Sequence, residues 1–361
     1  MTRTDLPPSA HGTPTQRTRR LRAGDVVEIR SEAEILSTLD ADGTLDGLPF
    51  MPEMLASCGR RFTVENRADT TCFFASLLDM DAAVHLTGAR CDGSAHGGCQ
   101  AGCLIFWKEE WLRPVTSTAA ELSTGAPDSG GPVAREPVRR SGATAADLDR
   151  ATHAPGSPVG TPDDVWSCQN TQLRAATRRI PHWDLRHFAR DARRGTVPVR
   201  TVLKYLVPYL LNTYQSVSRH KFPRWLRIRG GAAIPPVHGW LTRTPVARLG
   251  LQPGEWVRVR SRAEIRETLD KQGRNRGLSF ETEMTPYCGR TMRVDRRVRR
   301  VIDDWTGTML DLPGDCIVLD GAVCKGLYHG LCTRQTDPFW REIWLERVPA
   351  GPALKAPDSE R

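Results

Sequence analysis

The sequence predicts an α+β protein built from two copies of a small SH3-like β-barrel, each a metal-binding module, joined by a disordered linker and a helical segment. Three observations lead to this prediction. The chain contains an internal repeat, its apolar residues alternate in short segments between glycine-rich turns, and one set of cysteine and histidine residues recurs in both copies. Several short strands separated by turn signals are typical of small all-β barrels.

The repeat is visible without gaps from Gly24 to Val64 and from Gly254 to Val294, where 20 of 41 positions are identical. Similarity resumes later, where VHLTGARCDGSAHGGC matches IVLDGAVCKGLYHGLC, and again where FWKEEWL matches FWREIWL. A repeat of this kind decides the architecture before any local pattern does.

The chain is therefore divided into six predicted parts. They are a disordered basic tail (1–20), a first metal-binding β module (21–115), a flexible linker (116–160), a helical segment (161–235), a second metal-binding β module (236–350) and a tail (351–361). The linker is rich in Ser, Thr, Ala, Gly and Pro, which is typical of flexible connections. In the helical segment we expect helices over 166–180, 183–195 and 199–220.

Each module begins with an alternating apolar strand followed by a helix start signal. Ser31 stands three residues before Glu34, and Ser261 stands three residues before Glu264. This spacing predicts a capping box, in which the serine and glutamate side chains each bond the other residue's backbone N–H. A short helix should follow in both modules. The later segments with two tryptophans each should be strands whose rings fill the core.

The metal prediction depends on the pattern C-x4-H-x2-C. It occurs at Cys91, His96 and Cys99 and again at Cys324, His329 and Cys332, while the residues between these positions differ. Thiolate and imidazole bind zinc or iron strongly, and short spacings bring several donors to one ion. Each copy also has a cysteine in an earlier Cys-Gly turn, and these two would complete four ligands per module: Cys58 and Cys288. The alternative is that the cysteines are buried thiols or form disulfides.

The two copies differ in their other thiols. The first adds Cys72 and Cys103, Cys168 follows the linker, and the second adds only Cys316. This asymmetry places the functional site in module 1, with Cys103 as a further metal ligand, and leaves module 2 a stabilising site. Candidate catalytic residues are Cys103, Cys168 and Glu53. Glu53 and its counterpart Glu283 are either partners of the metal or ordinary turn residues. The expected cofactor is zinc or an iron–sulfur cluster.

The stretch CDGSAHGGCQAGC with the later FWKEEWL resembles an uncharacterised group of bacterial proteins that share this duplicated layout. The run Cys91-Asp92-Gly93-Ser94 also resembles, locally, the CDGSH iron–sulfur family, which supplies three cysteines and one histidine to a two-iron cluster. The sequence departs from that family because Ala95 precedes His96 and no C-x-C pair stands upstream. The local resemblance to the CDGSH family implies iron–sulfur chemistry. The resemblance to the bacterial group implies a role in specialised metabolism as an accessory protein or enzyme.

Composition limits the remaining classes of function. No apolar leader and no run of 18 apolar residues is present, so we expect a cytoplasmic protein without a membrane span. The formal charge of +9, carried mostly by arginine, leaves open a zinc-stabilised nucleic-acid-binding protein. A third possibility is a structural adaptor that binds a protein partner through the helical segment. No nucleotide-binding or hydrolase signature motif is present.

Overall fold

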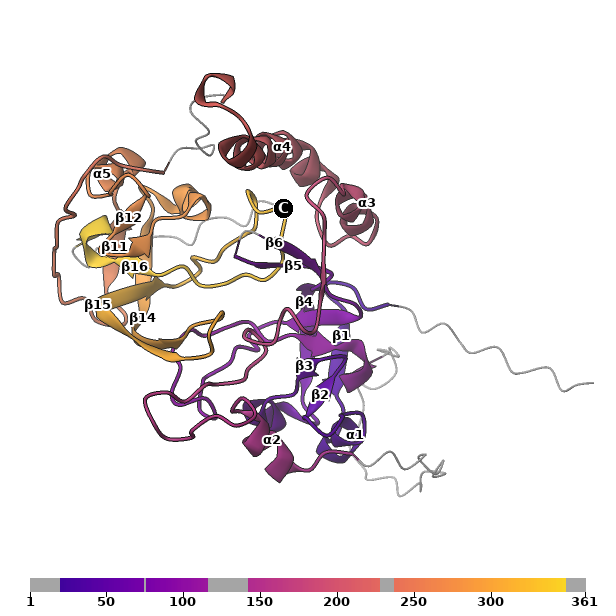
Figure 1. Cartoon of the computed structure of the whole chain (residues 1–361). Helices are drawn as coiled ribbons and strands as arrows, with labels where there is room; N and C mark the ends of the chain where they lie inside the picture. The colour runs from indigo at the N-terminus through magenta and orange to yellow at the C-terminus, as the bar shows by residue number, and fades with distance from the viewer. Residues whose placement is uncertain (1–19, 75, 116–141, 228–236, 349–361) are drawn as a thin grey trace, which may run out of the picture.

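The structure is a computed structural model that describes residues 20–74, 76–115, 142–227 and 237–348. Two five-stranded antiparallel sheets dominate it, one in each module, with strand orders β8-β7-β4-β1-β9 and β16-β15-β14-β11-β17. Figure 1 shows the first module from indigo to magenta and the second from orange to yellow, with α3 and α4 packed along one side.

The first module contains nine strands, one α-helix and two 3-10 turns. They are β1 (Val26–Ile29), α1 (Glu32–Leu36), β2 (Thr44–Leu45), β3 (Leu48–Pro49), η1 (Pro52–Ser57), β4 (Arg61–Arg67), β5 (Thr70–Phe73), β6 (Ser76–Asp79), β7 (Ala83–Leu86), β8 (Trp107–Lys108), η2 (Glu109–Trp111) and β9 (Leu112–Pro114). The strands β5 and β6 form a hairpin outside the main sheet.

The second module follows the same order, except that its central strands are long and no separate hairpin lies between them. Its elements are β11 (Trp256–Val259), α5 (Arg262–Arg266), β12 (Arg274–Asn275), β13 (Leu278–Ser279), η5 (Thr282–Tyr287), β14 (Thr291–Ile302), β15 (Met309–Leu319), β16 (Trp340–Arg341), η6 (Glu342–Trp344) and β17 (Leu345–Arg347).

Local signals predicted from the sequence form as expected in both modules. Ser31 and Glu34 make the reciprocal capping box at the start of α1, and Ser261 and Glu264 make it at α5. The paired tryptophans fill the cores: Trp107, Trp111, Trp340 and Trp344 are all 0% exposed. Burial of rings of this size supplies much of the stability of a small module.

The prediction of a closed SH3-like barrel is wrong. In the described residues each five-stranded sheet is open, because no ladder joins its edge strands, β8 to β9 or β16 to β17. These edge strands are two or three residues long and are linked directly by η2 and η6, so they have little backbone to pair with. The protein is a mixed α/β structure with several open antiparallel sheets.

Between the modules lie α2 (Ala145–Ala151), β10 (Arg178–Arg179), α3 (Arg186–Arg193), α4 (Val199–Lys221) and η3 (Arg224–Leu226). The helix expected at 166–180 is absent, and the chain there forms turns before β10. The linker expected to be flexible carries α2 in its second half, with Leu148 buried against the first module. Residues 116–141 of that linker and the predicted tails at 1–19 and 351–361 lie outside the described residues.

Each module extends an arm to the other module. The hairpin β5–β6 reaches the loop after β15, where Thr333 N–H donates to Thr70 O at 3.0 Å. The far ends of β14 and β15 reach the loop after β7, where Gln100 N–H donates to Arg300 O at 2.9 Å. Thr70 and Arg300 are separated by the same offset as Gly24 and Gly254. The two contacts are therefore equivalent, and the exchange of arms is reciprocal.

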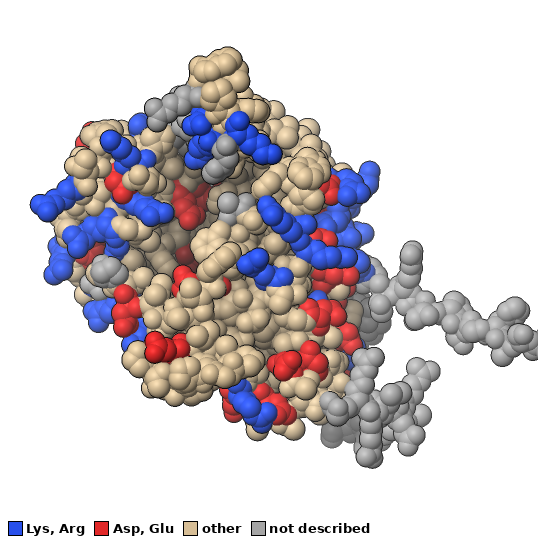
Figure 2. All heavy atoms as spheres, in the orientation of Figure 1, with Lys and Arg blue, Asp and Glu red and all other residues tan. Residues whose placement is uncertain are grey.

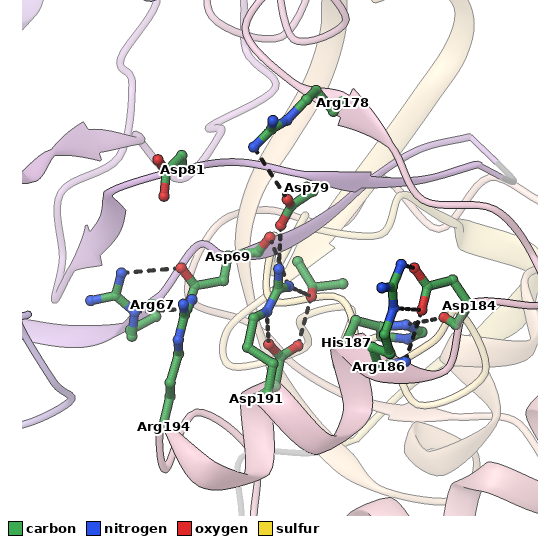
Figure 3. Close-up of polar contacts among 12 residues, drawn as sticks. Arg67, Asp69, Asp79, Asp81, Arg178, Asp184, Arg186, His187, Asp191 and Arg194 are labelled. Carbon is green, nitrogen blue, oxygen red and sulfur yellow. Dashed lines mark hydrogen bonds and ion pairs between the residues drawn. The ribbon is translucent and has the colours of Figure 1, made fainter.

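A buried charged cluster fixes α3 to the first module. Asp69 is 1% exposed and lies between two arginines, accepting from Arg67 Nε at 2.7 Å and pairing with Arg194 Nη1 at 2.9 Å. Figure 3 shows Arg67 from β4 and Arg194, the residue that follows α3, meeting at this carboxylate. The two guanidinium groups hold the pKa of Asp69 below its usual range although burial opposes ionisation.

The surface charge is mixed in sign. Figure 2 shows Lys and Arg gathered over the upper half of the visible face, near α3, α4 and the second module, with Asp and Glu between and below them. Several exposed arginines of the second module are in ion pairs, such as Arg258 with Glu346 and Arg347 with Glu255. Paired charges contribute less positive potential to a polyanion site than their number suggests.

Candidate metal centres

The loop after β7 folds back on itself and brings its donors together. Cys91 N–H donates to Cys103 O at 2.8 Å, which closes the loop. Gly93 has a φ of +70°, and a Cβ built there would lie 2.0 Å from the carbonyl oxygen of Cys99. Only glycine fits at such a close approach of two backbones. The equivalent Gly326 in module 2 packs against Cys332 in the same way.

Three donors from two parts of module 1 converge at this loop. Glu53, from η1, joins Cys91 and His96, and one ligand atom of each lies within 4.8 Å of the others. Glu53 Oε1 is 3.2 Å from Cys91 Sγ and 2.8 Å from His96 Nδ1. The side chains of His96 and Glu53 are 1% and 4% exposed. This group could hold a metal ion.

The tautomer of His96 follows from its second partner. Nε2 lies 3.1 Å from Ser167 O, and a backbone carbonyl can only accept, so Nε2 carries the proton. Nδ1 then faces the Glu53 carboxylate at hydrogen-bond distance. Two acceptors so close need a cation between them, which is either a second proton or a metal ion. Burial opposes ionisation of Glu53, but the hydrogen bond and the charge of a His96 ring that carries the second proton hold the pKa of Glu53 below its usual value.

Module 2 contains the corresponding group of Glu283, Cys324 and His329, again with ligand atoms within 4.8 Å. The carboxylate is held differently here, because it accepts backbone N–H groups from Leu327 at 3.0 Å and Tyr328 at 2.5 Å. Burial raises the pKa of Glu283 despite these bonds. Glu283 therefore organises the loop, whereas Glu53 faces the donors directly.

The first group adjoins a small cavity of about 30 Å³. Four cysteines line it, together with His96 and Ile302: Cys91, Cys99, Cys103 and Cys168. Cys103 Sγ accepts from Asn170 Nδ2 at 2.8 Å. Desolvation raises the pKa of Cys103 above its usual range and that of Cys168 to about 11. Without a cation these thiols are protonated at neutral pH.

Cys72 lies at the second group, although the sequence counted it as an extra thiol of module 1. It comes from β5 and packs in the same apolar cluster as Cys332, which is 3% exposed. The hydrogen bond from Cys332, with the charges of Arg334 and His329, lowers the pKa of Cys72 to about 7. The sequence gives no signal for this placement, because it depends on the exchange of arms.

Three cysteines lie apart from these groups. Cys58 and Cys288 follow η1 and η5, are half-buried, and pack against the cores of their own modules. Desolvation raises the pKa of Cys58, and it raises that of Cys288 to about 11. Cys316 is buried in β15 beside Arg341. The sequence assigned Cys58 and Cys288 as fourth ligands, but in the described residues neither belongs to the two groups, where a glutamate stands instead.

Comparison of the chain with protein-family models, with curated proteins and with solved structures gave no match. Among the described residues, no helix combines the length and apolarity needed to cross a bilayer. The class of protein is therefore defined by the site alone. It is a protein with two groups of cysteine, histidine and glutamate that could hold metal ions.

Proposed function

We propose that this protein is a zinc metalloprotein that binds one ion at each of the two groups. The observation that carries the proposal is the meeting of His96 Nδ1 with the Glu53 carboxylate and Cys91, while Ser167 holds the other imidazole nitrogen. A donation from the second nitrogen to a carbonyl is the usual support of a metal-bound histidine. The same three residue types recur in module 2.

The residues fit zinc better than an iron–sulfur cluster. Carboxylate, imidazole and thiolate together are common zinc ligands, whereas iron–sulfur clusters are held mainly by thiolates. Glu53 Oε2 is buried and has no hydrogen-bond partner within the described residues. An ion at this group would compensate that oxygen. Zinc, when bound, acts as a Lewis acid and lowers the pKa of a bound water.

The second centre is the one that a small molecule can reach. A cleft of about 400 Å³ adjoins it, within the usual size range of small-molecule sites. One wall presents Cys72, Tyr328 and His329, and the facing wall is the polar side of α4 with Asn212, Thr213 and Ser216 among others. The first centre, which the thiol count favoured as the functional one, adjoins the smaller cavity of about 30 Å³. We therefore place the functional centre in module 2.

Metal analysis and an absorption spectrum of protein purified under nitrogen test the proposal. We expect about two zinc ions per chain and no visible colour. Cys91→Ser and Cys324→Ser should each lose one ion. Cys58→Ser and Cys288→Ser are matched controls, because they change the same chemistry in the same modules outside the groups, and both ions should remain. Iron with acid-labile sulfide would overturn the choice of zinc, and a folded metal-free protein would overturn the function.

The placement of the functional centre has its own test. A small chelator such as dipicolinate is added to Cys91→Ser protein, which retains the second centre, and to Cys324→Ser protein, which retains the first. Zinc should leave the second centre at least about ten times faster, because the cleft admits the chelator. Equal rates, or faster loss from the first centre, would refute this placement.

A further inference from the structure

We propose that each metal centre is completed by a cysteine from outside its own module: Cys72, from the first module's hairpin, binds the ion of the second centre, and Cys168, from the central segment, binds that of the first. This inference rests on the proposed metal-binding function. Both cysteines are half-buried and lie beside other cysteines: Cys72 packs in the cluster of Cys332, and Cys168 lines the cavity of Cys91 and Cys99.

The position of Cys72 is fixed by contacts with module 2. It packs in the same apolar cluster as Cys332, Leu327 and Leu331. Its carbonyl oxygen accepts from Arg334 Nη1 at 3.1 Å. Cys332 belongs to the C-x4-H-x2-C pattern that also supplies the second group, so Cys72 brings an additional thiolate beside that group.

The hairpin that carries Cys72 is held rigidly from the opposite side by α3. Thr70 Oγ1 donates to Asp191 Oδ2 at 2.6 Å and accepts from Arg190 Nη2 at 2.7 Å. Arg190 also pairs with Asp79, the residue of β6 that lies opposite Thr70 in the hairpin. Figure 3 shows Asp79 and Asp191 linked through the side chains between them, and Figure 1 shows β5 and β6 between α3 and the second module. Ligands held by outer hydrogen bonds in this way are typical of metal sites.

Cys168 lies at the first centre in a turn that is also held by hydrogen bonds. The preceding residue, Ser167, accepts from His96 Nε2. The following residue, Gln169, is 3% exposed, and its side chain accepts from Phe106 N at 2.9 Å and donates to Phe106 O at 2.9 Å. Cys168 thereby lines the cavity together with Cys91, His96 and Cys99.

Reciprocity of the arms explains why two different segments supply these cysteines. Ile302 follows Cys72 by the same offset that separates Gly24 from Gly254, so the two residues hold equivalent positions in the repeat. Ile302 N–H lies 3.4 Å from Cys99 Sγ, as Cys72 lies against Cys332. The position that carries a thiol at the second centre thus carries isoleucine at the first, and Cys168 supplies the missing thiol there.

At the second centre, the three cysteines and His329 would then supply four zinc ligands, and a small molecule in the adjoining cleft would meet the ion as a fifth ligand. Glu283, already held by backbone N–H groups, serves as a hydrogen-bond partner. The ion would connect parts of the chain that lie in different modules: Cys72, Cys324, His329 and Cys332.

The experiment measures zinc affinity of each centre separately, by competition with a chromophoric chelator. Cys72→Ser should weaken the second centre by more than about 100-fold, since loss of an outer partner alone costs about 10–100-fold. It should leave the first centre unchanged. Cys168→Ser should do the reverse, and Cys288→Ser should change neither. If Cys324→Ser loses an ion while Cys72→Ser and Cys168→Ser retain both at unchanged affinity, the inference fails and the proposed function stands.

A measurement on the wild-type protein avoids the question of whether the variants fold. Native protein, with and without a chelator, is treated with iodoacetamide, digested and analysed by mass spectrometry. Cys72 and Cys168 should be protected in the metal-loaded protein and alkylated after chelation, together with Cys91 and Cys324. If the metal protects Cys91 and Cys324 while Cys72 and Cys168 are alkylated in the metal-loaded protein, the inference is overturned. The proposed metal-binding function would still stand.

Discussion

Replacement of His85 by valine should remove most of the acid sensitivity of the first module. His85 lies in β7 and is 0% exposed. Its Nδ1–H donates to Ile105 O at 2.9 Å, and Nε2 has no partner within the described residues. Burial lowers the pKa of His85 to about 4, because a proton on Nε2 would be buried without an acceptor. Valine is the matched replacement, since the repeat places buried Val318 at the equivalent position.

The magnitude follows from the difference between the folded and unfolded states. The ordinary pKa of histidine is about 6.5, so between pH 6.5 and 4 the unfolded chain binds more protons than the folded one. Stability from this residue is therefore complete above pH 6.5 and falls as the pH falls towards 4. Between pH 7.5 and pH 5 the loss amounts to about 2 kcal/mol. At pH 7.5 the variant should lose only about 1 kcal/mol, from the hydrogen bond to Ile105.

Urea unfolding followed by tryptophan fluorescence measures this difference, with chelator present so that metal release does not contribute. Unfolding free energies of the wild-type and His85→Val proteins are compared at pH 7.5 and pH 5. The wild-type value should fall by about 2 kcal/mol more than that of the variant. Parallel pH dependence in the two proteins would refute the assignment of His85 as a neutral buried residue.

Three further predictions concern the metal centres. Gly93→Ala should abolish zinc binding at the first centre, because the new Cβ would clash with the backbone of the loop. Gly98 has a similar φ but open space around it, so Gly98→Ala should cost only about 1–2 kcal/mol of stability. Zinc stoichiometry and thermal unfolding distinguish the two variants. Glu53→Gln should weaken zinc binding at the first centre about 10–100-fold without lowering stability. Glu283→Gln should weaken zinc binding at the second centre and also lower the melting temperature, since two backbone N–H groups lose part of their acceptor. Equal effects of the two substitutions on the melting temperature would contradict the difference in their contacts. Asp191→Asn should weaken zinc binding at the second centre alone, by up to about tenfold in a chelator competition. An effect on zinc binding at the first centre would contradict the role of α3 in holding the hairpin.

Features encoded by neighbouring residues could be predicted from the sequence. The capping boxes at Ser31 and Ser261 involve residues three apart, and both form as predicted. The loop that brings Cys91 near His96 is likewise local, since the turn at Gly93 requires only the residues within it. Glu53 was recognised as a repeated carboxylate, but the sequence favoured a surface or turn role for it over one at the metal.

Features that depend on tertiary contacts could not be predicted. The helix expected at 166–180 is absent because Gln169 bonds both backbone groups of Phe106, so tertiary contacts override helical propensity. The location of Cys72 at the second centre depends on contacts between modules, which no spacing within one module encodes. Closure of the sheets was wrongly inferred from the number of strands. Pairing depends on the lengths of the edge strands, and strand ends are the least certain part of a sequence-based assignment.

The reciprocal exchange of arms has a consequence for the history of the chain. The contact of Thr333 with Thr70 and that of Gln100 with Arg300 are the same contact made twice, once in each direction. Contacts that repeat in this way are those of an isologous interface, in which two identical subunits use the same surface. A single ancestral module could thus have assembled as a swapped homodimer. Fusion of its two copies would have freed each half to change alone, as cysteine at position 72 and isoleucine at position 302 now illustrate.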